Sequence, residues 1–232
     1  MSCIEKFIFF PHAGGLAYSY YKLAHVIEKN TGISTFVYEY AGRGERQKEA
    51  AFTDFKTAIE SILQDIFENY PADKYYLFGH SMGSYIAMEV AKSMMDDGKN
   101  VSTLFVSGLT SPSYEKVDSK EINDENIMRY LKMFNSIPDE IVGKESLRKM
   151  YMNIIRNDFV LLNSYTECQK QTEPFKKLIV LYGMEDPVIK EEKLEEWAEL
   201  ENEYFDIVSY SGDHFYIFGQ EDELGMDICG WM

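Results

Sequence analysis

One serine, Ser81, lies in a sequence pattern that is typical of a nucleophilic serine. Residues 79–83 read GHSMG and match G-x-S-x-G around Ser81, with the apolar run YYLF before them and a segment of helical periodicity after them. The glycines allow a tight strand-to-helix turn that exposes the serine Oγ, and the helix N-terminus stabilises negative charge there. We therefore predict that Ser81 attacks a substrate carbonyl. The alternative is an incidental glycine-rich turn.

A serine hydroxyl is a weak nucleophile at neutral pH, so the site needs a base. The chain has four histidines. His25 falls inside a predicted helix, and the side chain of His80 should point away from its neighbour Ser81. His214 follows the last predicted strand, at the carboxyl edge where open α/β sheets place their sites. We predict that His214 is the base, and the alternative is a surface histidine in a glycine turn.

The base in turn needs a carboxylate that orients its imidazole. Asp186 lies in GMEDP at 183–187, directly after a predicted strand and between the serine and the histidine in chain order. The loop after the preceding strand, GLTSP at 108–112, carries no acid. We predict Asp186 as the third member of a triad. Glu185 is the rival, and a helix-capping role for Asp186 is the non-catalytic alternative.

The tetrahedral oxyanion of such a reaction needs two hydrogen-bond donors. The backbone N–H of Met82, just after the nucleophile, can supply one, and the loop PHAGG at 11–15 can supply the other through the N–H of Ala13. Glycines in this loop let the main chain approach the reacting centre closely. A Rossmann phosphate loop is the competing interpretation, but the turn lacks the G-x-G-x-x-G spacing.

The elements that position these residues alternate along the chain. Short apolar strand candidates lie at 6–10, 35–40, 74–78, 103–107, 177–182 and 204–210, and helix candidates at 17–29, 54–68, 82–95 and 191–200. Thr53 is the expected N-cap of the second helix. This alternation predicts an α/β fold with a mostly parallel sheet and helices on both faces.

The domain organisation is expected to be simple. We predict one domain over 1–232, with a helical lid inserted at about 112–170 and helices at 122–134 and 146–165, separated by a punctuated stretch at 136–139. The alternative is a helical excursion that only completes the core. Residues 221–232 have a sparse pattern, which indicates a frayed helix or a tail.

Composition narrows the function classes. The 232 residues include 39 acidic and 23 basic ones, a formal charge of −16, which argues against nucleic acid or anionic lipid as a partner. Neither a signal peptide nor a membrane span is indicated, and Cys3, Cys168 and Cys229 form no metal-binding or disulfide pattern. We expect a cytoplasmic, monomeric protein that holds no metal and no cofactor.

Taken together, several motifs resemble the type II thioesterases that accompany non-ribosomal peptide and polyketide synthases, which have the α/β-hydrolase fold. The segments are FPHAGG at 10–15, YAGRGER at 40–46, GHSMG at 79–83, VSG at 106–108, RNDF at 156–159, GMEDP at 183–187 and GDHF at 212–215. The chain departs from the family pattern at Ala41, where proline is usual, at Asn157, where a small residue is commoner, and in its short tail after His214.

The resemblance implies a substrate and a partner. The substrate would be an acyl group on the phosphopantetheine arm of an acyl- or peptidyl-carrier protein, bound transiently, so phosphopantetheine enters only as part of the substrate. Ser81 would take the acyl group as an oxyester, water activated by His214 would free the acid, and the role would be editing of stalled carriers. Basic residues of the predicted lid could dock an acidic carrier or form a solvated face with mixed charges: Arg129, Lys132, Arg148, Lys149 and Arg156.

Other functions remain open at this point. A free-standing carboxylesterase or lipase acting on small oxyesters would need the same triad. A chain-terminating thioesterase or cyclase would normally be fused to a synthase module, which this chain, starting almost at its first strand, does not suggest. A non-catalytic binding protein on a hydrolase scaffold would normally have lost a member of the triad, and here all three are present.

Overall fold

The computed structural model describes residues 3–116, 118–134, 144–165 and 173–232. A six-stranded sheet in the order β2-β1-β3-β4-β5-β6 forms its centre, and every neighbouring pair of strands is parallel. The strands are β1 (Glu5–Phe10), β2 (Ser34–Val37), β3 (Lys74–His80), β4 (Val101–Ser107), β5 (Phe175–Gly183) and β6 (Glu201–Tyr210). This sheet confirms the predicted α/β class with a parallel sheet. Strand β2 is shorter than predicted. Its backbone pairing with β1 ends with the hydrogen bond from the N–H of Tyr38 to the carbonyl of Phe9 at 2.9 Å, and the chain then enters the turn at 41–44.

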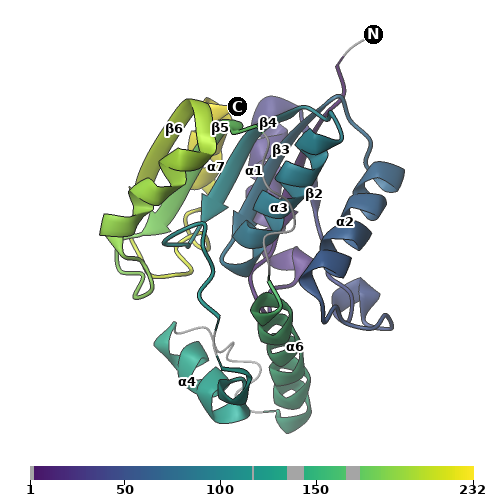
Figure 1. The fold of residues 1–232 in the computed structure, drawn as a ribbon, viewed down its shortest axis with the longest axis vertical. Coiled ribbons are helices and arrows are strands. Elements are labelled where there is room, and N and C mark those ends of the chain that lie inside the picture. The colour runs from purple at the N-terminus through teal and green to yellow at the C-terminus, as the bar shows by residue number, and fades with distance from the viewer. Residues whose placement is uncertain (1–2, 117, 135–143, 166–172) are drawn as a thin grey trace.

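Helices cover both faces of the sheet (Figure 1). The α-helices are α1 (Tyr21–Thr31), α2 (Phe55–Asn69), α3 (Met82–Asp96), α4 (Asp124–Met133), α6 (Glu145–Asn163) and α7 (Glu221–Trp231). Shorter or tighter 3₁₀ helices lie at Ala17–Tyr20, Gly44–Arg46, Ser119–Glu121 and Glu191–Leu200. The last of these coincides with a predicted helix but has the 3₁₀ form.

The alternation of side chains along β1 divides the core into two layers. Phe7 and Phe9 belong to the hydrophobic cluster that includes residues of α1 and α7, whereas Ile8 and Phe10 belong to the cluster built on α2 and α3. Successive side chains of a strand point to opposite faces, so a strand with apolar residues at every position is buried on both. The continuous apolar sequence of β1 is therefore explained by its burial on both faces of the sheet.

Two helix boundaries differ from the prediction. Helix α2 is capped by Asp54 and not by Thr53, because the Asp54 side chain accepts a hydrogen bond from the backbone N–H of Thr57 at 2.8 Å. The C-terminal segment is a regular helix, α7, and not a frayed end. Its Leu224 and Ile228 are fully buried in the same cluster as residues of α1.

The predicted lid region contributes two helices beyond the carboxyl edge of the sheet, α4 and α6 (Figure 1). They lie where the sequence predicts helices at 122–134 and 146–165. The punctuated stretch at 136–139 and Cys168 lie outside the described residues. The organisation as one domain with a lid at 112–170 stays a prediction. In the described parts of the chain, no helix combines the length and the apolar character that crossing a membrane requires.

Candidate active site

Ser81 lies at a strained turn between β3 and α3. It is the only non-glycine residue of the described chain with positive φ, at 54°. This conformation is costly for a residue with a side chain and is typical of a nucleophile held on a sharp strand-to-helix turn. The turn is fixed from both sides, because the N–H of Ser81 donates to the carbonyl of Ser107 at 2.7 Å and its carbonyl accepts from Ser84 at 2.9 Å.

The two glycines of GHSMG are required by close packing of backbone. A Cβ on Gly79 would overlap the carbonyl of Gly83, and a Cβ on Gly83 would overlap the carbonyl of Phe10 at the end of β1. The first contact closes the turn around Ser81. The second brings the loop that follows β1 against the N-terminus of α3, where Met82 is the first helical residue.

The structure brings His214 and Asp186 into contact. His214 Nδ1 lies 2.6 Å from Asp186 Oδ2, and the two side chains are 5% and 0% exposed. Because an ionised carboxylate only accepts, Nδ1 carries the proton of this hydrogen bond and Nε2 is left to exchange a proton with a substrate group. The rival Glu185 is exposed, so Asp186 and not Glu185 is the carboxylate on the imidazole.

The loops that carry this pair are joined through their backbones. The N–H of Glu185 donates to the carbonyl of Gly212 at 3.0 Å, and a Cβ on Gly183 would overlap the carbonyl of Asp213. Asp186 Oδ1 also accepts from the N–H of Val188 at 3.1 Å, which fixes the orientation of the carboxylate. The turn after β5 and the loop after β6 thus form one rigid unit at the carboxyl edge.

Ser81 and His214 line the same cavity of about 530 Å³. Three elements contribute to the wall of this cavity: α3 with Met82 and Tyr85, the segment after β4 with Tyr114, and α4 with Tyr130. In the described residues no hydrogen bond joins the Ser81 hydroxyl to His214. Catalytic hydrogen bonds are often long in a free enzyme and tighten when substrate is bound, so shared access to one cavity is the relevant observation.

The predicted donors of the oxyanion site lie on neighbouring backbone segments. Ala13 belongs to the loop that the Gly83 contact brings against α3, and Met82 begins that helix. The N–H of Ala13 has no hydrogen-bond partner among the described residues, whereas the N–H of Gly15 donates to the carbonyl of His12 at 2.9 Å. An amide left free at such a loop is available to a substrate oxygen.

The remaining buried histidines serve other contacts. His80 Nδ1 lies 2.9 Å from Ser107 Oγ, which lies 2.7 Å from the hydroxyl of Tyr216. Because Ser107 is fully buried, it cannot meet a substrate, and this pair is not a second nucleophile. Burial first, and the neighbouring histidines second, hold the pKa of His80 well below its ordinary value, and burial lowers the pKa of His12 to about 3.

Arg43 and Asp158, to which the sequence analysis assigned no role, lie beside this site. They form a buried ion pair next to the loop that carries Ala13. The signal was present in two of the motifs, at 40–46 and 156–159, but only their pairing in space reveals what the residues contact.

The fold and the serine turn define an α/β-hydrolase, and comparison with known proteins gives the family. Residues 5–229 match the family model described as Thioesterase domain. The chain therefore belongs to the thioesterase family, and the predicted class, a serine hydrolase of the thioesterase type, is confirmed.

Its similar proteins come from biosynthetic systems. The chain is 28% identical over 225 residues to the gramicidin S biosynthesis protein GrsT of Aneurinibacillus migulanus, covering 94% of this chain and 85% of that protein. It is 27% identical over 227 residues to the probable cadicidin biosynthesis thioesterase of Streptomyces griseus, covering 97% of this chain but only 61% of that protein.

Solved structures agree on the fold. ClbQ from the colibactin NRPS/PKS pathway has a TM-score of 0.87 at 23% identity, covering 99% of this chain and 97% of that one. The type II thioesterase BorB from the borrelidin biosynthetic cluster has a TM-score of 0.81 at 23% identity, covering 98% and 90%. These similarities confirm the predicted α/β-hydrolase fold.

Proposed function

We propose that this protein is a type II thioesterase that hydrolyses acyl groups from the phosphopantetheine arm of carrier proteins, in an editing role beside a non-ribosomal peptide or polyketide synthase. The observation that carries the proposal is the His214–Asp186 contact of 2.6 Å, at a cavity that Ser81 also lines. The names of the relatives, which belong to peptide and polyketide pathways, support the substrate class.

In this mechanism Ser81 Oγ attacks the thioester carbonyl while His214 Nε2 takes its proton. Asp186 stabilises the imidazolium, and the N–H groups of Ala13 and Met82 donate to the oxyanion. Collapse of the tetrahedral intermediate breaks the C–S bond, and His214 returns the proton to the leaving thiol. Water then attacks the acyl-Ser81 ester and loses a proton to His214. The bond between the acyl carbon and Ser81 Oγ breaks, His214 returns the proton to Oγ, and the free acid leaves.

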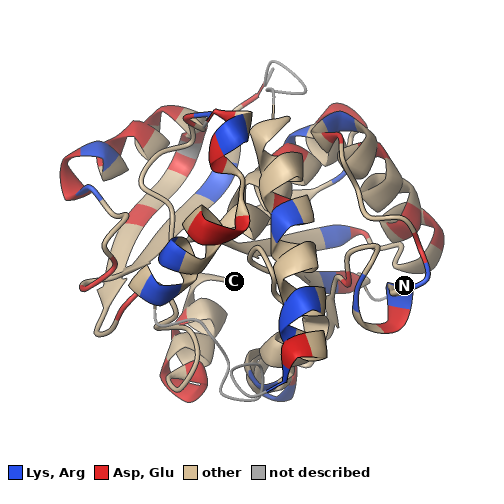
Figure 2. Ribbon diagram, turned by 90° about the horizontal axis from the view of Figure 1, so that it is seen from below, with Lys and Arg blue, Asp and Glu red and all other residues tan. Residues whose placement is uncertain are grey.

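The carrier partner would meet the face that bears α4 and α6. Arg148, Lys149 and Arg156 border a groove there of about 670 Å³, but Lys149 pairs with Glu145 at 2.8 Å and Arg156 pairs with Asp124. Seen from this side, basic and acidic residues are interspersed (Figure 2). A mixed surface on a chain of net charge −16 supports weak, local and salt-sensitive docking, which suits transient editing.

A competition between substrates tests the proposal. The same acyl group is offered as a thioester on a carrier protein and as a simple oxyester, and the deacylated carrier is followed by its mass. We expect a kcat/KM at least about tenfold higher on the carrier, since binding energy from the remote arm is available to the transition state only there. A clear preference for the oxyester would make the protein a carboxylesterase.

A further inference from the structure

We propose that Arg43 and Asp158 form a positioning pair that holds the loop at 11–15 so that the N–H of Ala13 points at the substrate oxygen. This inference rests on the proposed function, because it assigns a cause to the geometry of the proposed oxyanion site. It concerns a turn after β2 and a residue of α6, neither of which touches the reacting atoms.

The pair binds two backbone groups of the loop, the N–H of Gly14 and the carbonyl of Gly15. Asp158 Oδ2 accepts from the N–H of Gly14 at 2.7 Å and from Arg43 Nη1 at 2.7 Å, and Oδ1 accepts from Arg43 Nη2. Arg43 Nη1 also donates to the carbonyl of Gly15 at 3.3 Å. The carboxylate therefore holds the N–H that directly follows Ala13, and the guanidinium holds the carbonyl of Gly15.

Other backbone groups of the loop are hydrogen-bonded as well. The N–H of His12 donates to the hydroxyl of Tyr20 at 3.1 Å, and the carbonyl of Pro11 accepts from the hydroxyl of Tyr40 at 3.1 Å. The N–H groups of Gly14 and Gly15 are bonded too. Among residues 12–15 of the described structure, only the N–H of Ala13 therefore has no hydrogen-bond partner. A donor held by its neighbours and itself unused is preorganised for charge that develops during the reaction.

The pair is stiff because it is buried. Arg43 and Asp158 are 3% and 2% exposed, and a bidentate guanidinium–carboxylate contact in a low-dielectric surrounding resists distortion. Gly14 has φ of +80°, and a Cβ there would come within 2.7 Å of Ile155 Cγ1 on α6. Helix α6 therefore packs directly on the oxyanion loop, and Asp158 is the polar part of that contact.

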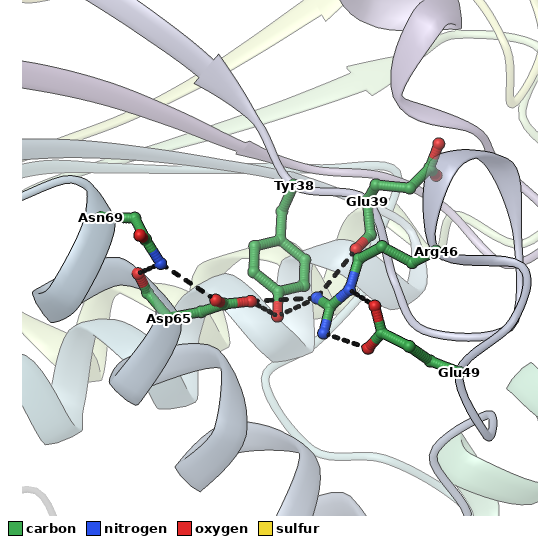
Figure 3. A network of polar contacts seen from close by, with 6 residues as sticks. All are labelled: Tyr38, Glu39, Arg46, Glu49, Asp65 and Asn69. Carbon is green, nitrogen blue, oxygen red and sulfur yellow. Dashed lines mark hydrogen bonds and ion pairs between the residues drawn. The ribbon is translucent and has the colours of Figure 1, made fainter.

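The motif at 40–46 contains a second arginine, Arg46, which lies away from the loop at 11–15. Arg46 donates to the hydroxyl of Tyr38 at 2.8 Å and to Asp65 of α2 at 3.0 Å, and it pairs with Glu49 (Figure 3). None of these contacts involves residues 11–15. Arg46→Met is therefore a control for general effects of losing a charged anchor from this turn.

The test compares two variants that both lack the charges. Arg43→Met with Asp158→Asn keeps a side-chain oxygen that can accept from Gly14, whereas Arg43→Met with Asp158→Leu, of nearly the same shape, does not. Replacing both charges together avoids leaving one buried ion unpaired. Hydrolysis of an acyl-pantetheine thioester is measured well below each thermal midpoint, together with inhibition by an alkyl boronic acid, whose tetrahedral adduct on serine uses the oxyanion site.

We expect the Leu variant to lose about tenfold or more in kcat relative to the Asn variant, with KM within about threefold, since full loss of such a donor costs about 10²- to 10³-fold. Its inhibition constant for the boronic acid should rise in parallel, which a purely structural role would not cause. Equal kcat in the two variants would overturn the inference.

A single substitution covers the case in which neither double variant folds. Asp158→Glu keeps the charge but displaces the carboxylate by one methylene, so kcat should fall about tenfold at unchanged KM. A value within twofold of wild type would also overturn the inference. Ser81→Ala is measured in parallel, because hydrolysis that persists in that variant would refute the proposed function itself and not only the role of the pair.

Discussion

At the scale of single residues, the site depends on which carboxylate meets the imidazole. Both Asp186 and Glu185 stand in the turn after β5, and chain order could not separate them. In the structure Asp186 is buried against His214 while Glu185 is exposed, so the two neighbours differ sharply in what they can do to the base.

The first prediction concerns this pair of carboxylates. Asp186→Asn should lower kcat by roughly 10³- to 10⁴-fold, because an amide cannot hold the imidazole in the required tautomer or stabilise its charged form. Glu185→Gln removes a charge one position away and should leave kcat within about twofold. Steady-state hydrolysis of an acyl thioester measures both, and equal effects of the two substitutions would refute the assignment.

A second prediction concerns the buried histidines. Burial lowers the pKa of His12 from 6.5 to about 3, so between these values the unfolded chain binds a proton that the folded chain does not. The stability contributed by the neutral form is complete above pH 6.5 and is lost as the pH falls toward 3. The unfolding free energy should decrease by up to about 1.4 kcal/mol per pH unit for this group, and His80 acts in the same direction.

Denaturant unfolding between pH 6.5 and 5 checks this slope. His12→Gln should flatten it, whereas His25→Gln, at an exposed position of α1, is the matched control. A slope that stays the same in the His12 variant would contradict the assignment of a buried neutral imidazole.

At the scale of elements, α7 shows why sequence patterns fail at chain ends. Glycines at 225 and 230 and three acidic residues in the first turn weaken the apolar pattern. In the structure the acidic start suits the positive end of the helix dipole, and Gly225 allows close approach to Val26 of α1. These causes depend on tertiary contact, so the sequence did not reveal them.

The third prediction tests the packing of α7. Ile228 is fully buried, so Ile228→Ala should destabilise the protein by about 2–5 kcal/mol through lost burial and a residual cavity. Met226 is 54% exposed on the same helix, and Met226→Ala should change stability by less than about 0.5 kcal/mol. Chemical denaturation compares the two, and similar small effects would mean that α7 is loosely attached.

At the scale of the whole molecule, the sequence predicted the sheet because its strands contain apolar runs, which in β1, β3 and β4 are buried on both faces. That Ser81 and His214 share a cavity and that His214 contacts Asp186 could be anticipated, because each residue follows a strand at the carboxyl edge of the parallel sheet. The contact between Arg43 and Asp158 could not be predicted from the sequence. The two residues are 115 positions apart, and neither lies in a pattern that indicates chemistry of its own. Local spacing therefore reveals the strand-to-helix turn at Ser81 but not the contacts that residues distant in the sequence make near it.

If the acyl group passes through Ser81, the protein itself should gain the mass of that group during turnover. The enzyme is mixed with an acyl-pantetheine thioester, quenched with acid during the first turnovers and digested. We expect a mass increase equal to the acyl group on the peptide that contains Ser81, and neither adduct nor turnover in Ser81→Ala. Thioester hydrolysis at the wild-type rate in Ser81→Ala, or an adduct on another residue, would contradict it.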